Sequence, residues 1–174
     1  MRKQMLATVA VAALIVFAQS ATARPIDVTR NGCGLNAPIT SGSYVRQDFK
    51  PTFSVLRKAK VVVYNYWTFG TADMRVDLYD GSGEFLASSS TEAVVEVTLA
   101  DAQAGQTVVF SFGGGVAVTP GSAYQLRLLQ VSGDGLPGIC YALNTYPDGY
   151  LWFGINGYNT YDLEFAVSGG GKPK

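Results

Sequence analysis

Aromatic and amide side chains are interleaved with glycines in one stretch of the chain, residues 141–161. Its rings are Tyr141, Tyr146, Tyr150, Trp152, Phe153, Tyr158 and Tyr161, and its polar partners are Asn144, Asp148, Asn156 and Asn159. Aromatic faces stack on the C–H surfaces of sugars, while amide and carboxylate groups hydrogen-bond to hydroxyls. Glycines at 149, 154 and 157 would let a ligand approach the backbone closely. This composition predicts a carbohydrate-binding loop.

We expect six side chains of this stretch to contact the ligand: Tyr146, Asp148, Tyr150, Trp152, Asn156 and Tyr158. The alternative is that the rings fill the core of a β-sheet protein, where tyrosine and phenylalanine also occur. Trp67, with Tyr64 and Tyr66 beside it, is a second candidate for a ligand contact.

The chain contains no histidine. This removes the usual general base, the usual activator of a serine or cysteine nucleophile, and the commonest zinc ligand. Glycoside hydrolysis needs only two carboxylates, and the candidates are Asp77, Asp80, Glu84, Glu92, Glu96, Asp162 and Glu164. Asp162 and Glu164 would share one strand face about 7 Å apart. The alternative is that these carboxylates face water, so the residues favour binding over catalysis.

The run Asp80-Gly81-Ser82-Gly83 superficially suggests a calcium loop. An EF-hand loop needs oxygen ligands at regular spacing before the Asp-Gly pair, and those places hold Leu78 and Val76. We therefore expect a plain hairpin turn, no cofactor, and no metal site that can be assigned to particular residues.

Cys33 and Cys140 are the chain's two cysteines. In an oxidising compartment we expect them to form a disulfide. The bridge would close a loop of about 107 residues, which the chain-entropy model values at about 4–5 kcal/mol. The alternative is two separate buried thiols.

Residues 1–23 have the pattern of a cleaved signal peptide. Arg2 and Lys3 are basic, residues 5–18 are apolar, and Ala21-Thr22-Ala23 supplies small residues at the cleavage point. The apolar run is shorter than the roughly 20 residues of a membrane span. We expect a secreted or periplasmic protein without membrane insertion after cleavage.

The charge of the mature chain bears on its partners. Loss of the two basic residues with the signal leaves 11 basic and 13 acidic residues, a net charge of −2. Nucleic-acid partners normally require a basic face, so we expect none.

The rest of the chain divides into short segments of alternating polarity between turn residues. Strands are predicted at 43–49, 58–67, 74–79, 84–88, 94–99, 108–112, 116–119, 123–131, 139–143, 150–153 and 161–167, with one helical turn at 100–105. The organisation expected is an irregular segment at 24–42, an antiparallel β-sandwich domain at 43–167 and a flexible tail at 168–174.

The order of these features resembles secreted bacterial jelly-roll domains of the carbohydrate-binding-module type. The resemblance covers 43–167 and rests on Gln47-Asp48-Phe49, the strand and glycine turn at 76–83, the pair 109–112 and 120–126, Gly149-Tyr150, and the closing strand 162–165. It implies a single antiparallel jelly-roll β-sandwich that binds a glycan, and it makes structural calcium an expectation without assigned ligands.

These observations lead to three functional hypotheses. The first is a non-enzymatic exported module that binds carbohydrate at or outside the cell surface. The second is a structural or protein-interaction domain of the envelope or secreted matrix, and the third is a carboxylate glycosidase.

Overall fold

The structure is a computed structural model that describes residues 26–27, 35–40, 42–65, 71–89, 93–94, 106–143 and 146–171. All regular elements among these residues are β-strands, and none of the described residues forms a helix that could span a membrane. The predicted all-β class is therefore confirmed. The signal peptide, the predicted strand around 95–99, the helical turn at 100–105, and Trp67 lie outside the described residues.

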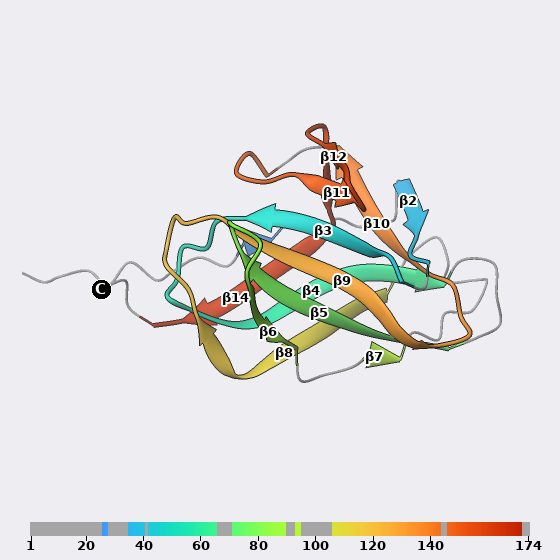
Figure 1. Ribbon diagram of the computed structural model, residues 1–174, viewed down its shortest axis with the longest axis horizontal. Coiled ribbons are helices and arrows are strands. Elements are labelled where there is room, and N and C mark those ends of the chain that lie inside the picture. Colours follow the sequence, from blue (N-terminus) through green and yellow to red (C-terminus); the bar gives the residue numbers. More distant parts are fainter. Residues whose placement is uncertain are drawn as a thin grey trace, which may run out of the picture.

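The front sheet, which faces the reader in Figure 1, has the strand order β12–β11–β3–β9–β5–β6, with β7 also paired to β5. The strands are β3 Tyr44–Phe49, β5 Ala72–Asp80, β6 Phe85–Ser88, β7 Ala93–Val94, β9 Tyr124–Gly133, β11 Leu151–Phe153 and β12 Asn156–Tyr158. Its neighbouring strands run antiparallel.

The back sheet has the order β1–β14–β4–β10–β13, with β2 paired to β10 and β8 paired to β4. Its strands are β1 Ile26–Asp27, β2 Leu35–Pro38, β4 Val55–Asn65, β8 Gln106–Ala117, β10 Pro137–Leu143, β13 Tyr161–Leu163 and β14 Phe165–Gly170. These strands also pair antiparallel, so the predicted antiparallel β-sandwich is confirmed. The jelly-roll connectivity stays a prediction.

The core lies between the two sheets and follows from period-two alternation. In β3, for example, Val45, Gln47 and Phe49 are buried while the residues between them are only half-buried. The rings of Phe49 from the front sheet and of Phe110 and Phe165 from the back sheet are completely buried. Alternate side chains of a strand point to opposite faces, so each strand supplies one row to this core and one row to an outer surface.

The predicted turn at Asp80 is confirmed. The backbone N–H of Gly83 donates to the Asp80 carbonyl at 3.1 Å and β6 returns beside β5. The Asp80 carboxylate accepts hydrogen bonds from the Ser82 hydroxyl and from the backbone of Ser82 and Glu84. These bonds, led by that of Ser82, hold the pKa of Asp80 below its usual value, and they make its carboxylate part of the turn.

Two of the predicted strand divisions are wrong. The glycines at 113–115 do not end a strand, because β8 continues to Ala117. Gly113 and Gly115 adopt positive φ. The pairing of β8 with β4 shifts its register at this point and continues beyond the glycines. The predicted strand 161–167 is two strands, β13 and β14, which part at Glu164.

The two ends of the domain are also more regular than predicted. The supposedly flexible tail is still paired with β4 as far as Gly170, because backbone pairing does not need large side chains. Within the segment 24–42, which was expected to be irregular, β1 pairs with β14 and β2 pairs with β10.

Cys140 is completely buried in β10, and there is no free cysteine among the described residues. Its expected partner, Cys33, lies outside them. The Cys33–Cys140 disulfide therefore stays a prediction.

One buried polar side chain joins the two sheets. Gln47 in β3 is completely buried, and its Oε1 accepts the backbone N–H of Leu163 in β13 at 2.8 Å. Its Nε2 donates to Asp162 Oδ1 at 3.3 Å and to the Asp48 carbonyl at 3.0 Å. A buried amide that satisfies both its donor and acceptor in this way fixes the position of β13 relative to β3.

This bridge predicts the effect of Gln47→Leu. The apolar substitute keeps the volume but leaves the Leu163 N–H and the Asp162 carboxylate buried with fewer partners, at a cost of about 1–3 kcal/mol in the free energy of unfolding. Gln106→Leu, at an exposed position of β8, is the matched control and should change it by less than about 0.5 kcal/mol. Urea unfolding measures both, and equal stabilities would contradict the role of the bridge.

Candidate functional site

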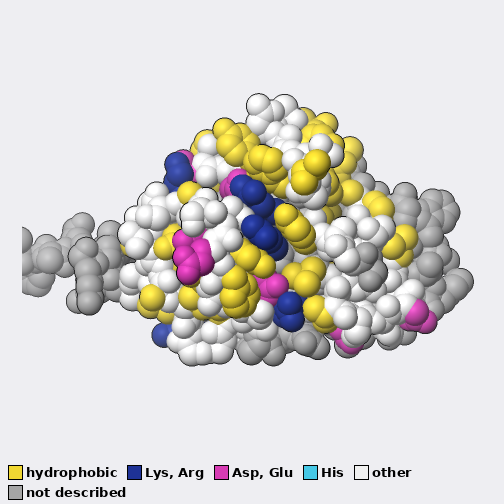
Figure 2. Space-filling view, in the orientation of Figure 1, with side chains coloured by type: hydrophobic (Ala, Val, Ile, Leu, Met, Phe, Trp, Pro, Cys, Tyr) yellow, Lys and Arg dark blue, Asp and Glu magenta, His cyan; other side chains and the backbone are white. Residues whose placement is uncertain are grey.

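The outer surface of the front sheet, which we call the front face, carries a row of polar side chains across four strands. Cross-strand pairing places Trp152 of β11 opposite Arg46 of β3, Arg46 opposite Arg127 of β9, and Arg127 opposite Asp77 of β5. Side chains directly opposite one another on one face are in contact range. Figure 2 shows Lys and Arg side chains along the middle of this face with hydrophobic side chains on either side.

Two arginines of the front face are each neutralised by an aspartate two residues further along the same strand. Arg46 Nε and Nη2 donate to the two Asp48 oxygens at 2.6 and 2.9 Å. Arg75 makes the same two bonds to Asp77 at 2.8 and 3.1 Å. Such bidentate pairs are rigid and directional, so these groups hold fixed positions on the surface.

The third arginine has a neutral partner. Arg127 Nε and Nη2 donate to Gln125 Oε1 at 3.3 and 2.8 Å. Its guanidinium lies 3.7 Å from the ring centroid of Tyr79 and 5.0 Å from that of Tyr44. Gln125 thus takes the place that an aspartate occupies beside Arg46 and Arg75, and the two rings stack on the guanidinium.

Two hollows open on the front face. The first hollow, of about 240 Å³, is lined by Arg46, Asp48, Lys50, Gly81, Ala123, Tyr124, Gln125, Pro147, Asp148, Gly149 and Tyr150. The second hollow, of about 200 Å³, is lined by Gly42, Ser43, Tyr44, Asp77, Tyr79, Arg127, Leu129 and Gln130. Both lie over β3 and β9, so a ligand laid across the sheet would meet both.

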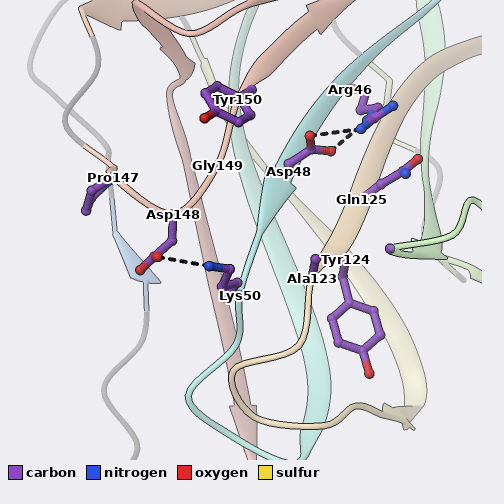
Figure 3. Close-up of a pocket in the computed structure, with 11 residues that line it drawn as sticks. Arg46, Asp48, Lys50, Ala123, Tyr124, Gln125, Pro147, Asp148, Gly149 and Tyr150 are labelled. Atoms are coloured by element: carbon purple, nitrogen blue, oxygen red, sulfur yellow. Dashed lines mark hydrogen bonds and ion pairs between the residues drawn. The ribbon is translucent and has the colours of Figure 1, made fainter.

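Figure 3 shows how the first hollow is built. Tyr150 and Asp148 come from the loop before β11 and form one wall. Asp48, paired with Arg46, and Gln125 rise from the neighbouring strands and form the other. Lys50 lies between Asp148 and β3, and its Nζ is 3.3 Å from Asp148 Oδ1.

The loop that carries Tyr150 is clamped onto β3. The Asp48 N–H donates to the Tyr150 carbonyl at 2.9 Å, and a Cβ on Gly149 would lie 1.9 Å from the Asp48 carbonyl oxygen. Only glycine permits this approach, because any side chain would force the two backbones apart. The loop position therefore depends on Gly149.

The hydroxyl of Tyr146 holds the start of the same loop. It accepts the Lys50 N–H at 2.8 Å and lies 3.2 Å from the Lys50 carbonyl, and the ring packs edge-on against Phe165. Burial, the largest cause, raises the pKa of Tyr146 above its usual value. Tyr146 was predicted to contact ligand, but the structure assigns its polar atom to the loop anchor.

The structure divides the other predicted site residues. Asp148 and Tyr150 line the first hollow, and Tyr150 is 49% exposed. Asn156 is exposed at the start of β12 and lines neither hollow.

Trp152 lies on the front face, but its surface is largely occupied. Its Nε1 donates to Asp48 Oδ2 at 2.9 Å, and the Arg46 guanidinium stands 4.4 Å from its ring centroid. Gly157 lies so close that an added Cβ would meet the ring at 2.8 Å. Trp152 therefore orients Arg46 and Asp48 rather than offering a free stacking surface.

Tyr158 lies on the opposite face of the β11–β12 ribbon. It pairs with Leu151, whose side chain is completely buried, and not with Trp152. Its ring joins an aromatic cluster with Phe153, Tyr161 and Tyr141, whose neighbouring centroids are 5.3–6.4 Å apart. The predicted site is thus two groups of rings that face in different directions.

Sequence reasoning missed the residues that contribute most to the front face. These are Tyr44, Arg46, Asp48, Tyr79, Gln125 and Arg127. The available signal was the spacing Arg-x-Asp in two predicted strands and Gln-x-Arg in a third. That spacing places both partners on one face of a strand, but it does not predict which strand lies beside it.

Among the described residues, the carboxylates considered for hydrolysis do not form a pair in either hollow. Asp162 and Glu164 are each 1% exposed, so the expectation that they face water is wrong. Asp162 Oδ2 accepts the Tyr146 N–H at 2.8 Å, so the buried carboxylate has a donor and acts in holding the loop. Asp77 is bound by Arg75 and Ser88.

Glu92, Glu96 and Asn144 lie outside the described residues. Within the described parts of the chain, no three metal-ligating side chains of His, Cys, Asp or Glu come together as a metal site would require.

Comparison with known proteins gives no family. No protein-family model matches the chain, and no curated protein is significantly similar to it. Among solved structures, one from infectious bursal disease virus, Gx strain, is similar over 84% of this chain at 10% identity and a TM-score of 0.33. The chain spans about a third of that protein's length, since 31% of it is covered. At this TM-score the likeness carries no functional argument.

The close contact at Gly149 predicts the effect of Gly149→Ala. The methyl group would push the loop away from β3 and break the Asp48–Tyr150 backbone bond, with a loss of about 1–3 kcal/mol in the free energy of unfolding. Gly114→Ala is the matched control, because nothing lies within 4 Å of its added Cβ. Urea unfolding compares the two; a Gly149→Ala protein as stable as the control would refute the clamp.

Proposed function

We propose that the chain is a non-enzymatic exported module that binds carbohydrate on its front face. The observation that carries the proposal is the first hollow, where the exposed ring of Tyr150 stands beside Asp48, Arg46 and Gln125. A sugar ring presents C–H groups on its faces and hydroxyls around its edge. An aromatic ring next to fixed donors and acceptors matches both.

The polar groups of this site are held in place without a ligand. Asp48 accepts from both Arg46 and Trp152, and Gln125 is held by Arg127. A ligand therefore does not have to order these side chains, which lowers the entropic cost of binding. The backbone contact between Gly149 and Asp48 likewise holds Tyr150 in place before a ligand binds.

The ion pairs favour binding over hydrolysis. A glycosidase needs one of its two carboxylic acids protonated before it transfers a proton to the leaving group. The two carboxylates that line the first hollow, Asp48 and Asp148, are paired with Arg46 and Lys50. Each carboxylate therefore already has a cation beside it, and its oxygens can also accept hydrogen bonds from sugar hydroxyls.

Tyr150→Ala tests the proposal directly. We expect glycan affinity to fall about tenfold or more, because burying one aromatic ring against the ligand contributes about 1.5–3 kcal/mol. Tyr158→Ala is the matched control: its ring is exposed to a similar degree, 41%, but faces away from the hollow. A glycan array followed by calorimetry on the best ligand measures both.

The outcome separates the site from a general effect of tyrosine loss. Equal losses in both variants, or no glycan bound by the unmodified protein, would refute the proposal. Asp48→Asn, which keeps the shape but weakens the bond to Arg46, should also lower affinity.

A protein-interaction role is the second candidate, supported by exposed apolar side chains beside the aromatic cluster. Leu143 is 64% exposed and is paired with Tyr161, and Ile155, at the β11–β12 turn, is 91% exposed. Large exposed apolar side chains can mark interfaces where they form a patch. Cross-linking to an envelope protein that is lost in Leu143→Ser with Ile155→Ser, while glycan binding is absent, would favour this role.

A further inference from the structure

We infer that the second hollow recognises a carboxylate on the sugar, so that the module selects acidic, uronic-acid-containing polysaccharides. The inference rests on the proposed function and names its substrate class. The residue that carries it is Arg127, which lines this hollow between Tyr44 and Tyr79.

Three strands of the front face carry the same spacing of polar side chains, but the middle strand differs in charge. β3 has Arg46 with Asp48, and β5 has Arg75 with Asp77. Between them, β9 has Gln125 with Arg127, and the glutamine carries no charge. Arg46 and Arg75 are thus each bonded to a negative charge, whereas Arg127 is bonded to a neutral amide that does not offset its positive charge.

The contacts of Arg127 leave its terminal edge available. A guanidinium has five N–H donors, and the bonds to Gln125 use one on Nε and one on Nη2. No hydrogen bond from Nη1 to a protein group occurs in the described residues. Nη1 and Nη2 together form the second fork of the guanidinium, with the spacing that matches two carboxylate oxygens.

The two tyrosines fix the plane of that fork. Tyr79 lies 3.7 Å and Tyr44 5.0 Å from the guanidinium carbon. Rings stacked on a guanidinium occupy its faces and leave its edge for hydrogen bonds. Tyr79 is itself braced by Phe85, whose ring is 5.5 Å away in an edge-on contact. A carboxylate that approaches the edge would meet donors already oriented.

Asp77, the carboxylate that lines the same hollow, does not compete for Arg127. Its Oδ1 and Oδ2 accept from Arg75, and Oδ1 also accepts the Ser88 hydroxyl at 2.6 Å. With these donors it is satisfied and only 6% exposed. The Nη1–Nη2 fork of Arg127 is therefore left to pair with an anionic group of the ligand.

Calorimetry with three oligosaccharides of equal length tests the inference: oligogalacturonate, a neutral galactose oligomer, and the same neutral oligomer carrying sulfate esters. We expect oligogalacturonate to bind about tenfold more tightly than the neutral oligomer, and less tightly as sodium chloride is raised. In Arg127→Gln the ratio of the two affinities should fall about tenfold, and Arg127→Lys, which keeps the charge but loses the fork, should lie between.

Arg57→Gln is the matched control, because Arg57 is exposed on β4 of the back sheet; it should leave the ratio unchanged. Unaltered unfolding midpoints show that each variant folds. If the neutral and acidic oligomers bind equally, or the sulfated one binds as tightly as oligogalacturonate, the inference is overturned while the proposed function stands. If none of the three oligosaccharides and no glycan of the array binds, both fail.

Discussion

The buried amide of Gln47 is the constraint on which the arrangement of the two sheets at the candidate site depends. It joins β3 of the front sheet to β13 of the back sheet through Leu163 and Asp162, and Asp162 in turn holds the backbone of Tyr146. An amide in an apolar core is tolerated only when its donor and acceptor are both satisfied. The observed position of β13 relative to β3 satisfies both groups of the amide. The same position of Asp162 anchors Tyr146, at the start of the loop that carries Tyr150.

The front face is built outward from this fixed point. The same strand that buries Gln47 presents Arg46 and Asp48 on its other side, because neighbouring residues of a strand point to opposite faces. Ion pairs, a stacked tryptophan and a glycine contact then hold the outward groups in place. Specific contacts thus fix both the buried amide and the outward groups, as the proposed binding function requires.

Much of the fold could be predicted from local patterns. Alternation in segments such as 43–49 and 74–79 predicted strands whose buried rows form part of the core, and Asp-Gly predicted the turn at Asp80. The failures occurred where pairing overrides local preference. β8 runs through three glycines because β4 continues beside it, and β14 extends into a glycine-rich end for the same reason.

The sequence by itself determined the all-β class, the absence of histidine and the two-faced character of each strand, because these follow from residue types and a period of two. It also grouped Tyr150, Trp152 and Tyr158 as expected ligand contacts. Only the tertiary structure decided that Tyr158 faces the other way and that Arg46, Arg127 and Asp77 form one row. Cross-strand register brings together residues far apart in the chain, and no local pattern encodes that register.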